Sequence, residues 1–359
     1  MRGELQSRQR RLASDLAEHR LDALIVSSGA SIRYLSGFSG SNALLLLTRD
    51  YSRLFTDPRY KLQASVECAC RVTVAKGPLT AALAAWVRRL RLRRIGFDPA
   101  HVSQALFEQL DKELPDAARL VPASGLVERR RMVKSAEEIA RIRRSVETAS
   151  RAFEETLPLI RPGIRELELA AELDYRARRL GAERPAFETI VAAGPRSAHP
   201  HARPTANCLG SNQLLLIDMG AMQDGYASDM TRMLHLGHPA RRVRDLYQAV
   251  LEAHQAALEA VRPGATAESV DRAARKSLRK AGLARAFVHS TGHGLGLEVH
   301  ERPRLGKGDV TRLEAGMALT IEPGVYFEEL GGIRVEDTVI VTPAGCEILT
   351  PTPRELVVL

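Results

Sequence analysis

The sequence has 359 residues, of which 45% are hydrophobic and 26% are charged. This length predicts two domains, and this composition is typical of a globular protein with a sizeable core. No apolar stretch reaches the roughly 18 residues that span a bilayer, and the polar N-terminus has no signal region, so we expect a cytoplasmic protein with no membrane partner. The four cysteines contain no CxxC pair, which argues against a disulfide framework or a zinc knuckle.

The positive charge is concentrated near the N-terminus. Residues 1–130 hold 21 Lys and Arg against 13 Asp and Glu, a net charge of +8 out of +9 for the whole chain. The densest basic run, Arg88–Arg94, closes a predicted amphipathic helix and has no interleaved aromatic residues. Surfaces that bind nucleic acid commonly combine both kinds of side chain, so we do not expect nucleic acid as a partner.

Residues 1–125 alternate between helical and strand-like patterns, which predicts an α/β N-terminal domain with a mixed sheet. The glycine and serine run Ser36–Ser41 lacks the lysine of a phosphate-binding loop and is predicted to be a turn. Strands are predicted at residues 22–26, 43–48, 53–56, 71–74 and 94–97, and helices at residues 6–20, 61–67, 79–90 and 103–114.

Residues 126–359 predict a second domain of the α+β class. A capping box formed by Ser135 and Glu138 starts a helix that runs to about residue 157, and Thr266 is suited to cap a later helix that stops at Gly282. Helices come before the strand-like residues 187–235 and again before residues 286–349. This repeated order predicts an internal pseudo-two-fold symmetry.

The central motif of this domain is a hairpin that carries two aspartates. The apolar run Leu214–Ile217 ends on Asp218, and a second run after the Asp224-Gly225 turn carries Asp229. Two runs joined by an Asp-Gly turn predict a β-hairpin, which brings the two aspartates close together. A buried carboxylate must be paired, protonated or bound to a metal. The hairpin alone is compatible with a metal site, or with one solvated turn acid and one capped acid.

Further histidines and glutamates occur in later apolar stretches. Three histidines, His289, His293 and His300, lie close together in the sequence, and Glu322 and Glu336 each lie in a β-like run. An unpaired acid in such a run is unfavourable. Strands that each contribute one acid or one histidine are therefore better explained as the walls of a metal site than as a hydrophobic core.

Five of these residues resemble, in type, order and spacing, the metal ligands of the pita-bread metallopeptidases. That family includes methionine aminopeptidase, Xaa-Pro aminopeptidase and Xaa-Pro dipeptidase (prolidase). The five residues are Asp218, Asp229, His293, Glu322 and Glu336. In addition, Ile32–Phe38 and Thr56–Tyr60 resemble the creatinase-type N-terminal domain of the proline-specific branch. The resemblance implies a creatinase-type domain at residues 1–125, for dimerisation and the rim of the site, and a pita-bread catalytic domain at residues 126–359.

The resemblance also implies two divalent metal ions. One histidine among four carboxylates suits Mn²⁺ best and is compatible with Co²⁺, Zn²⁺ or Fe²⁺. By resemblance, Asp229 and Glu336 bridge the ions, Asp218 binds one of them, and His293 with Glu322 binds the other. A hydroxide held between the ions attacks the scissile carbonyl, and Glu322 carries a proton to the leaving nitrogen.

Four further residues match positions near the substrate in the same family. His201 and His300 match histidines that contact the substrate and the tetrahedral intermediate, so both are predicted catalytic residues. His289 and Arg334 are predicted to bind substrate. The alternative for His289 is a hydrogen bond within the fold, and the alternatives for Arg334 are the orientation of a ligand or a plain salt bridge.

The implied activity is hydrolysis of the bond between an N-terminal residue and proline in short peptides, by a homodimer. An Xaa-Pro aminopeptidase is slightly favoured over an Xaa-Pro dipeptidase, because the chain lacks the long insertion that supplies a carboxylate-binding arginine in some dipeptidases. The basic residues that remain candidates for this function are Arg302, Arg304, Lys307 and Arg312. The alternatives are a metal-free creatinase-like amidinohydrolase and a non-catalytic peptide-binding homologue, neither of which retains the ligand set.

Overall fold

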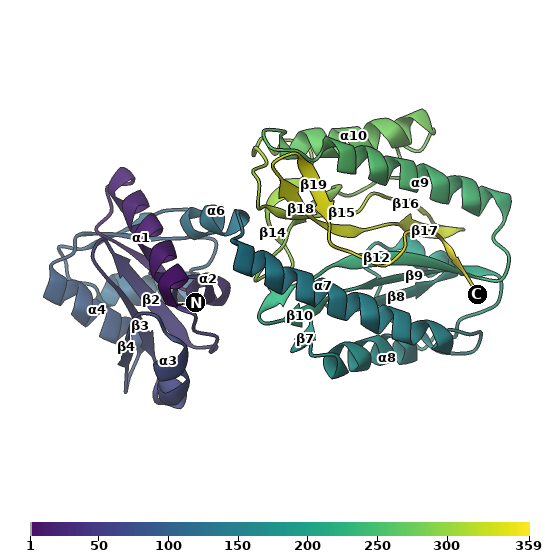
Figure 1. Cartoon of the computed structure of the whole chain (residues 1–359). Coiled ribbons are helices and arrows are strands. Elements are labelled where there is room, and N and C mark those ends of the chain that lie inside the picture. Colours follow the sequence, from purple (N-terminus) through teal and green to yellow (C-terminus); the bar gives the residue numbers. More distant parts are fainter. Residues whose placement is uncertain (1) are drawn as a thin grey trace. The chain divides into compact units, whose positions relative to one another are not determined.

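The computed structural model describes residues 2–359 and contains two compact units, which divide between Arg131 and Met132 (Figure 1). The predicted boundary after residue 125 lies at the start of helix α6 (Leu126–Met132), and the observed division lies near the end of this helix. Among the described helices, none is long and apolar enough to cross a membrane.

The N-terminal unit is a six-stranded mixed sheet with helices packed on it. Its elements are α1 (Arg2–Glu18), β1 (Ala23–Val26), α2 (Gly29–Ser36), β2 (Ala43–Thr48), β3 (Ser52–Thr56), η1 (Pro58–Tyr60), α3 (Lys61–Glu67), β4 (Arg71–Val74), α4 (Leu79–Leu90), β5 (Arg94–Phe97), α5 (Gln104–Glu113) and β6 (Arg119–Pro122). The strand order is β4-β3-β2-β1-β5-β6. Leu46 and Phe55 pack against Leu83 and Val87 of α4, which forms the core on one face of the sheet.

Helix α2 and strand β6 are among the elements of this unit that were not predicted. Helix α2 begins after Ser28, whose side chain accepts a hydrogen bond from the Ser31 amide, and it ends at Gly37, where φ is 84°. The helix is short and only partly overlaps the motif at residues 32–38, so its local pattern is weak. Edge strand β6 is partly exposed and carries only two apolar residues before its proline, which gives little strand signal.

The C-terminal unit holds the predicted site. Its helices are α7 (Ala136–Thr156), η2 (Leu157–Leu159), α8 (Glu166–Arg179), η3 (Gly194–Ala198), α9 (Arg241–Ala260) and α10 (Ala267–Lys280). The strands of its first half are β7 (Arg184–Pro185), β8 (Ile190–Ala193), β9 (Gln213–Met219), β10 (Ala221–Gln223), β11 (Tyr226–Ala227) and β12 (Met230–Leu236). The later strands are β13 (Gly292–Gly294), β14 (Glu301–Leu305), β15 (Ala318–Ile321), β16 (Gly324–Phe327), β17 (Gly331–Arg334), β18 (Asp337–Thr342), β19 (Gly345–Ile348) and β20 (Val357–Val358).

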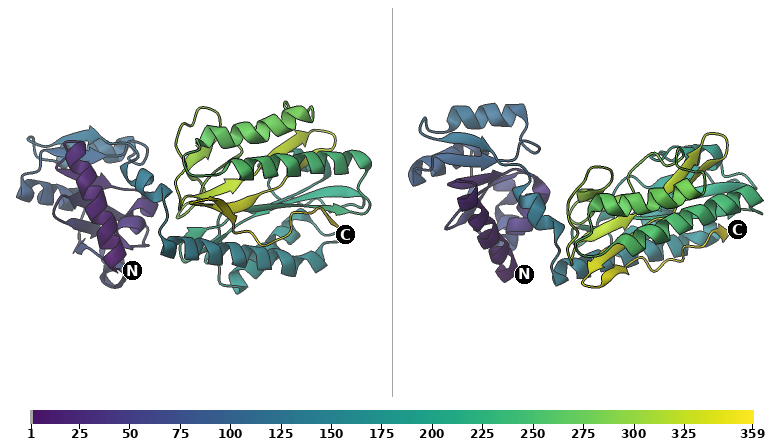
Figure 2. Two further views of the ribbon diagram at one scale, coloured as in Figure 1. Left: turned by 45° about the horizontal axis from the view of Figure 1, so that its top comes forward. Right: turned by 90° about the horizontal axis from the view of Figure 1, so that it is seen from above.

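Within this unit the strands lie between two helical layers. Helices α9 and α10 cover one side and α7 and α8 cover the other, as Figures 1 and 2 both show. Strand β9 is buried on both faces, because Leu214 and Leu216 belong to the core against α9 and α10, whereas Leu215 and Ile217 belong to the core against α7 and α8. Double burial explains the continuous apolar run that precedes Asp218.

The predicted aspartate hairpin is present. Strands β9 and β12 pair antiparallel, and the smaller pair β10 and β11 continues the hairpin to its turn. Asp224 and Gly225 both have positive φ, at 50° and 78°, as a two-residue type I′ turn requires. A Cβ at Gly220 would lie 1.9 Å from the Ser228 carbonyl oxygen, so only glycine allows the two strands to approach this closely.

The two halves of the unit repeat the same backbone pattern. In each half, a Pro-Gly turn leads into the second helix, and the residues around this turn form backbone hydrogen bonds with a later segment of the same half. In the first half, the Gly163 amide donates to the Leu209 carbonyl and the Glu166 amide to the Asn207 carbonyl. In the second half, the Gly264 amide donates to the Leu313 carbonyl and the Ala267 amide to the Thr311 carbonyl, and all four bonds measure 2.8–2.9 Å. This correspondence supports the predicted pseudo-two-fold symmetry at the level of individual hydrogen bonds.

Candidate metal centre

The hairpin places two of the five predicted ligands. Asp218 lies near the end of β9, opposite Thr231 of β12, and Asp229 comes immediately before β12. The carbonyl oxygen of Asp229 accepts a hydrogen bond of 2.9 Å from Thr338 Oγ1 of β18. This bond links the hairpin to the strand that follows Glu336, so ligands from the two halves are fixed to each other.

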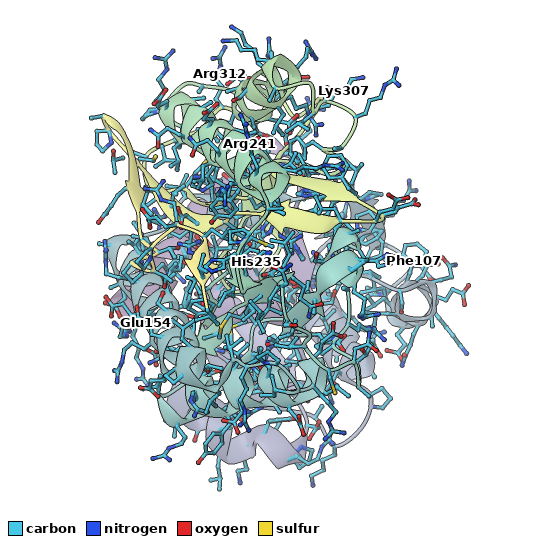
Figure 3. The ribbon with its side chains drawn as sticks, turned by 90° about the vertical axis from the view of Figure 1, so that its right-hand side faces the viewer. Phe107, Glu154, His235, Arg241, Lys307 and Arg312 are labelled. Atoms are coloured by element: carbon cyan, nitrogen blue, oxygen red, sulfur yellow. The ribbon has the colours of Figure 1, made fainter. Side chains whose placement is uncertain are left out.

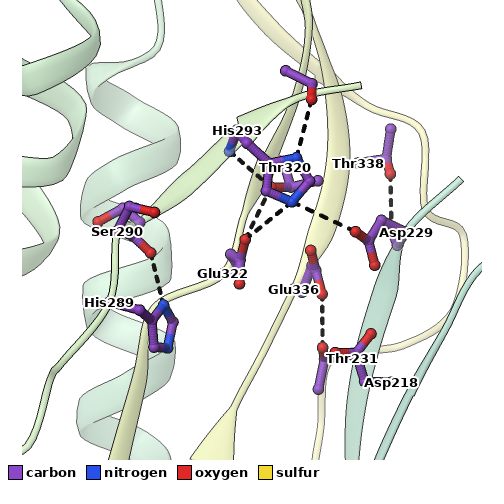
Figure 4. A network of polar contacts seen from close by, with 12 residues as sticks. Asp218, Asp229, Thr231, His289, Ser290, His293, Thr320, Glu322, Glu336 and Thr338 are labelled. Carbon is purple, nitrogen blue, oxygen red and sulfur yellow. Dashed lines mark hydrogen bonds and ion pairs between the residues drawn. The ribbon is translucent and has the colours of Figure 1, made fainter. Parts of the chain in front are cut away.

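His293 lies in β13, and Glu322 directly follows the neighbouring strand β15. Both residues contact the same threonine. Thr320 Oγ1 accepts a bond of 3.1 Å from the His293 amide and donates one of 3.3 Å to Glu322 Oε1. His293 Nδ1 lies 3.0 Å from the Gly294 carbonyl oxygen, which only accepts, so Nδ1 carries the ring proton. The lone pair of Nε2 therefore faces Glu322 Oε1 at 3.4 Å and Asp229 Oδ2 at 3.6 Å (Figure 4).

Glu336 completes the group. It lies between β17 and β18, and its Oε2 accepts a hydrogen bond of 2.6 Å from Thr231 Oγ1. One ligand atom from each of Asp229, His293 and Glu336 lies within 4.8 Å of the others. Glu322 and Glu336 were predicted to lie inside β-like runs. The structure places Glu322 directly after β15 and Glu336 directly before β18.

The electrostatics of the group favour a bound cation. Burial first, and then Glu336 and Asp218, raise the pKa of Asp229 well above its ordinary value, and burial also raises the pKa of Glu336. Arg334 is the only Arg or Lys among the described residues that lies within ion-pair distance of these four carboxylates. In addition, Asp218 Oδ1 is buried without a hydrogen-bond partner. The residues present therefore fit divalent metal ions, which would supply the missing positive charge.

The histidine is in the right form for metal binding. Burial, followed by the nearby His300, lowers the pKa of His293 to about 4, so its ring is neutral at pH 7. Neutral imidazole is the form that binds metals. Its ring centre lies 4.4 Å from that of His300, in an edge-to-face arrangement.

The structure places Arg334 beside Asp218. Its guanidinium is 3% exposed and donates to Asp218 Oδ2 at 2.6 Å, to Thr231 Oγ1 at 3.1 Å and to the Tyr326 hydroxyl at 2.8 Å. A fourth bond goes to the Pro200 carbonyl. These contacts suit the orientation of a ligand better than direct contact with a substrate carboxylate.

His289 is held by a network inside the fold. Its Nδ1 lies 2.8 Å from the Ser290 carbonyl oxygen, so Nδ1 is the donor and Nε2 accepts from the Tyr326 hydroxyl at 2.7 Å. Burial, together with Arg334, lowers the pKa of His289 to about 4. His289 is thus connected to Asp218 through Tyr326 and Arg334.

His201 and His300 lie on the open side of the site. Both are exposed, unlike the ligands. Burial of part of the ring, and then the positive charge of His201, lower the pKa of His300. Exposed histidines beside buried carboxylates are positioned to meet a ligand that enters from solvent.

Thr231, Thr320 and Tyr326 connect the site residues but were not identified from the sequence. Each uses a hydroxyl group to join two predicted site residues. The alternation within β12 offered one signal, since Thr231 must lie on the same face as Asp229. A threonine or tyrosine in a strand is otherwise common, so Thr320 and Tyr326 could not be singled out from their local pattern.

A second group of possible ligands lies in the N-terminal unit. Asp98, His101 and Glu128 approach one another. However, the two Asp98 oxygens accept bonds from the Ala100 and Gly125 amides, and Glu128 Oε1 lies 3.2 Å from His101 Nε2. These contacts account for the group as a structural support for the loop at residues 98–101.

The geometry of the C-terminal unit thus defines a carboxylate-rich site for divalent metals. Comparison with known families agrees with this: the model of metallopeptidase family M24 matches residues 140–343, and that of the creatinase/prolidase N-terminal domain matches residues 8–133. The chain belongs to metallopeptidase family M24, and its catalytic unit has the pita-bread fold.

Relatives with both units are known. The chain is 34% identical to an Xaa-Pro dipeptidase of Pyrococcus horikoshii over 95% of either chain. Among solved structures, an Xaa-Pro dipeptidase from Bacillus anthracis superposes with a TM-score of 0.96 at 34% identity, covering 99% of this chain and 100% of that one. An X-Pro aminopeptidase from Thermotoga maritima superposes with a TM-score of 0.90 at 36% identity, covering 98% and 100%. Both predicted activities therefore occur among similar proteins.

Proposed function

We propose that this protein hydrolyses the peptide bond before a proline at the second position of short peptides. The observation that carries the proposal is the convergence of four carboxylates and one neutral histidine in a buried site with too little positive charge of its own. The names of the similar proteins, which include Xaa-Pro dipeptidases and an X-Pro aminopeptidase, support the choice of proline.

Five residues would hold two divalent ions: Asp218, Asp229, His293, Glu322 and Glu336. This set of hard oxygen ligands with one imidazole suits Mn²⁺. When bound, such a pair of ions activates a water molecule and polarises the scissile carbonyl.

The protein's own side chains would move the proton and hold the substrate. Glu322 receives a proton from the attacking water and delivers it to the leaving nitrogen, as a positioned carboxylate can. His201 and His300, on the open side, donate hydrogen bonds to the substrate carbonyl as negative charge develops on its oxygen. Arg334 donates one hydrogen bond to Asp218 and another to the Tyr326 hydroxyl, so these two side chains hold Asp218 in place.

The position of one basic residue supports a dipeptidase as part of this proposal. Arg304 of β14 pairs directly opposite His293 of β13, and residues paired in this way project from the same face. Its neighbour Leu305 points into the core on the other face, and Arg304 is exposed. We therefore propose that Arg304 binds the carboxylate of a C-terminal proline. With this role for Arg304 we favour a dipeptidase over the aminopeptidase that was slightly favoured from the sequence, where no long insertion supplies such an arginine.

Two of the other basic candidates, Arg312 and Lys307, are placed less favourably. Arg312 donates a hydrogen bond to the Gly264 carbonyl at the start of the segment before α10. Figure 3 shows Lys307 and Arg312 at the edge of the unit beside the α10 layer, with Lys307 pointing outward. Lys307 therefore serves as a matched control for Arg304.

The test is hydrolysis of Ala-Pro and of Ala-Pro-Ala with added MnCl₂, by the wild type and the Arg304→Met and Lys307→Met variants. We expect the wild type to prefer Ala-Pro, and Arg304→Met to raise KM for Ala-Pro about 10- to 100-fold, the value of a charge-assisted hydrogen bond. Lys307→Met should leave KM unchanged. Efficient cleavage of Ala-Pro-Ala, with no effect of Arg304→Met, would instead identify an aminopeptidase.

A further inference from the structure

Arg232 is a fully buried arginine only three residues after the predicted ligand Asp229. It is 1% exposed and lies in β12. Successive strand residues point to opposite faces, so Thr231 reaches toward Glu336 in the site while Arg232 points away from it. A buried guanidinium is costly unless every N–H group is bonded.

All five N–H groups of Arg232 are used. Two go to the carbonyl oxygens of Thr231, at 3.0 Å, and of Glu336, at 2.6 Å, and a third goes to Asp337 Oδ1 at 2.7 Å. The remaining two go to the carbonyls of Thr352 and Pro353 in the C-terminal segment. One side chain thus joins β12, the start of β18 and the C-terminal segment.

Asp337 and His254 complete this buried group. Asp337 is also about 1% exposed, and its Oδ2 lies 3.4 Å from Nε2 of His254 on α9 and 3.6 Å from Nε of Arg354. Burial lowers the pKa of His254 to about 4, so its ring is neutral at pH 7. Asp337 and Arg232 therefore compensate each other's charge inside the core, and the partly exposed Arg354 lies beside Asp337.

This group lies where two separate sheets meet. Asp229 precedes β12 in the sheet β20-β12-β9-β8, whereas Glu336 precedes β18 in the sheet β14-β13-β15-β18-β19. The Glu336 amide donates to the Thr231 carbonyl at 3.2 Å, and Arg232 reaches both of these residues by their carbonyl oxygens. Arg232 therefore joins the backbone of Glu336 to that of Thr231, two residues after Asp229.

We propose that Arg232 and Asp337, with His254 packed against them, are positioning residues that set the separation of the Asp229 and Glu336 carboxylates and thereby the affinity for divalent metal. This inference rests on the proposed function in that it takes these two residues as metal ligands. A buried ion pair adds little net stability compared with apolar side chains. Its value here is the defined geometry that it gives to two acids that would otherwise repel each other.

The test is calorimetric titration of the metal-free protein with MnCl₂. Asp337→Asn keeps the shape of the side chain but removes its charge, and Arg232→Lys keeps the charge but cannot make five bonds. We expect each variant to bind Mn²⁺ about 10- to 100-fold more weakly, the range found when groups that orient metal ligands are removed. Having two variants guards against the failure of one to fold, which circular dichroism would reveal.

Glu166→Gln is the matched control. Glu166 is fully buried in the same unit, pairs with Arg196 at 3.1 Å and bonds the Ala193 and Thr205 amides, but it contacts none of the five ligands. We expect this variant to melt at a lower temperature than the wild type while its Mn²⁺ affinity stays unchanged. If a general loss of stability were enough to weaken metal binding, Glu166→Gln would lower both the melting temperature and the Mn²⁺ affinity.

Wild-type Mn²⁺ affinity in Asp337→Asn or in folded Arg232→Lys would overturn the inference, as would an equal loss of affinity in Glu166→Gln. Because the measured quantity is metal binding, the result is separate from the question of the substrate. If the wild type binds Mn²⁺ but cleaves no Xaa-Pro peptide, the proposed function fails while the positioning role is still decided by the titration.

Discussion

The two aspartates of the hairpin have different environments although they lie in one motif. Asp218 is paired with Arg334 at 2.6 Å, whereas Asp229 faces Glu336 and His293 without a cation of its own. The raised pKa of Asp229 follows from its burial beside other acids. The negative charge that a metal ion would compensate is therefore greatest between Asp229 and Glu336, the two residues predicted to bridge the ions.

Glu322 contributes to the pH dependence of stability in the metal-free protein. Burial raises its pKa to about 7 from 4.5. Because the folded-state pKa is above the unfolded one, the stability from its protonation is fully present below pH 4.5 and is lost as pH rises through 7. We expect Glu322→Gln to lose less stability than the wild type between pH 4.5 and 7.5, by up to about 3 kcal/mol.

Urea denaturation in EDTA at a series of pH values measures this difference. The buried histidines titrate in the same window with the opposite sign, because burial lowers the pKa of His254, His289 and His293 to about 4. They are present in both proteins, so the comparison reports the titration of Glu322 together with its effect on the pKa of Asp229 and Glu336. Equal pH slopes for the variant and the wild type would contradict the assignment.

Residue types and spacing were enough to single out five candidate ligands, which the structure brings together, but not the hydroxyl groups that join them. Asp218 and Asp229 could be paired because an Asp-Gly turn fixes a hairpin locally. The pairing of Thr231 with Glu336 depends on the meeting of two sheets more than a hundred residues apart in sequence. Nothing in the local pattern around Thr231 indicates that contact.

At the scale of elements, capping and double burial made the C-terminal helices and strands predictable. Ser135 accepts a bond from the Glu138 amide, and Thr266 accepts one from the Ser269 amide, as predicted for the starts of α7 and α10. Helix α2 and strand β6 were not predicted, because each is short and depends on tertiary packing for its stability.

The segment that carries His300 is held by a buried ion pair. Lys134 Nζ lies 3.0 Å from Glu301 Oε2, and the two side chains are 1% and 6% exposed. Removing one partner leaves a buried charge, so we expect Lys134→Met to lower the free energy of unfolding by about 3 kcal/mol or more. Because His300 adjoins Glu301, kcat for Ala-Pro should fall as well.

Urea denaturation and initial rates measure the two effects. The double variant Lys134→Met with Glu301→Gln removes both charges and should regain part of the lost stability. If the double variant is less stable than Lys134→Met alone, or if kcat is unchanged in both, the ion pair does not hold the segment in the way described.

At the scale of the whole molecule, the predicted metal ligands and most of the excess positive charge lie in different units. The five predicted ligands all lie in the C-terminal unit, three of them in its second half and two in its first. The N-terminal unit carries most of the net positive charge of the chain. Its predicted part in a homodimer stays a prediction.

The central claim is that divalent metal at these five residues is required for Xaa-Pro hydrolysis. The most direct measurement is the rate of Ala-Pro hydrolysis while the chelator-treated protein is titrated with MnCl₂, beside Asp229→Ala. We predict no hydrolysis without metal, a rate that saturates at about two ions per chain, and no recovery in the variant. Full hydrolysis by the chelated wild type, or recovery of Asp229→Ala with Mn²⁺, would contradict the claim.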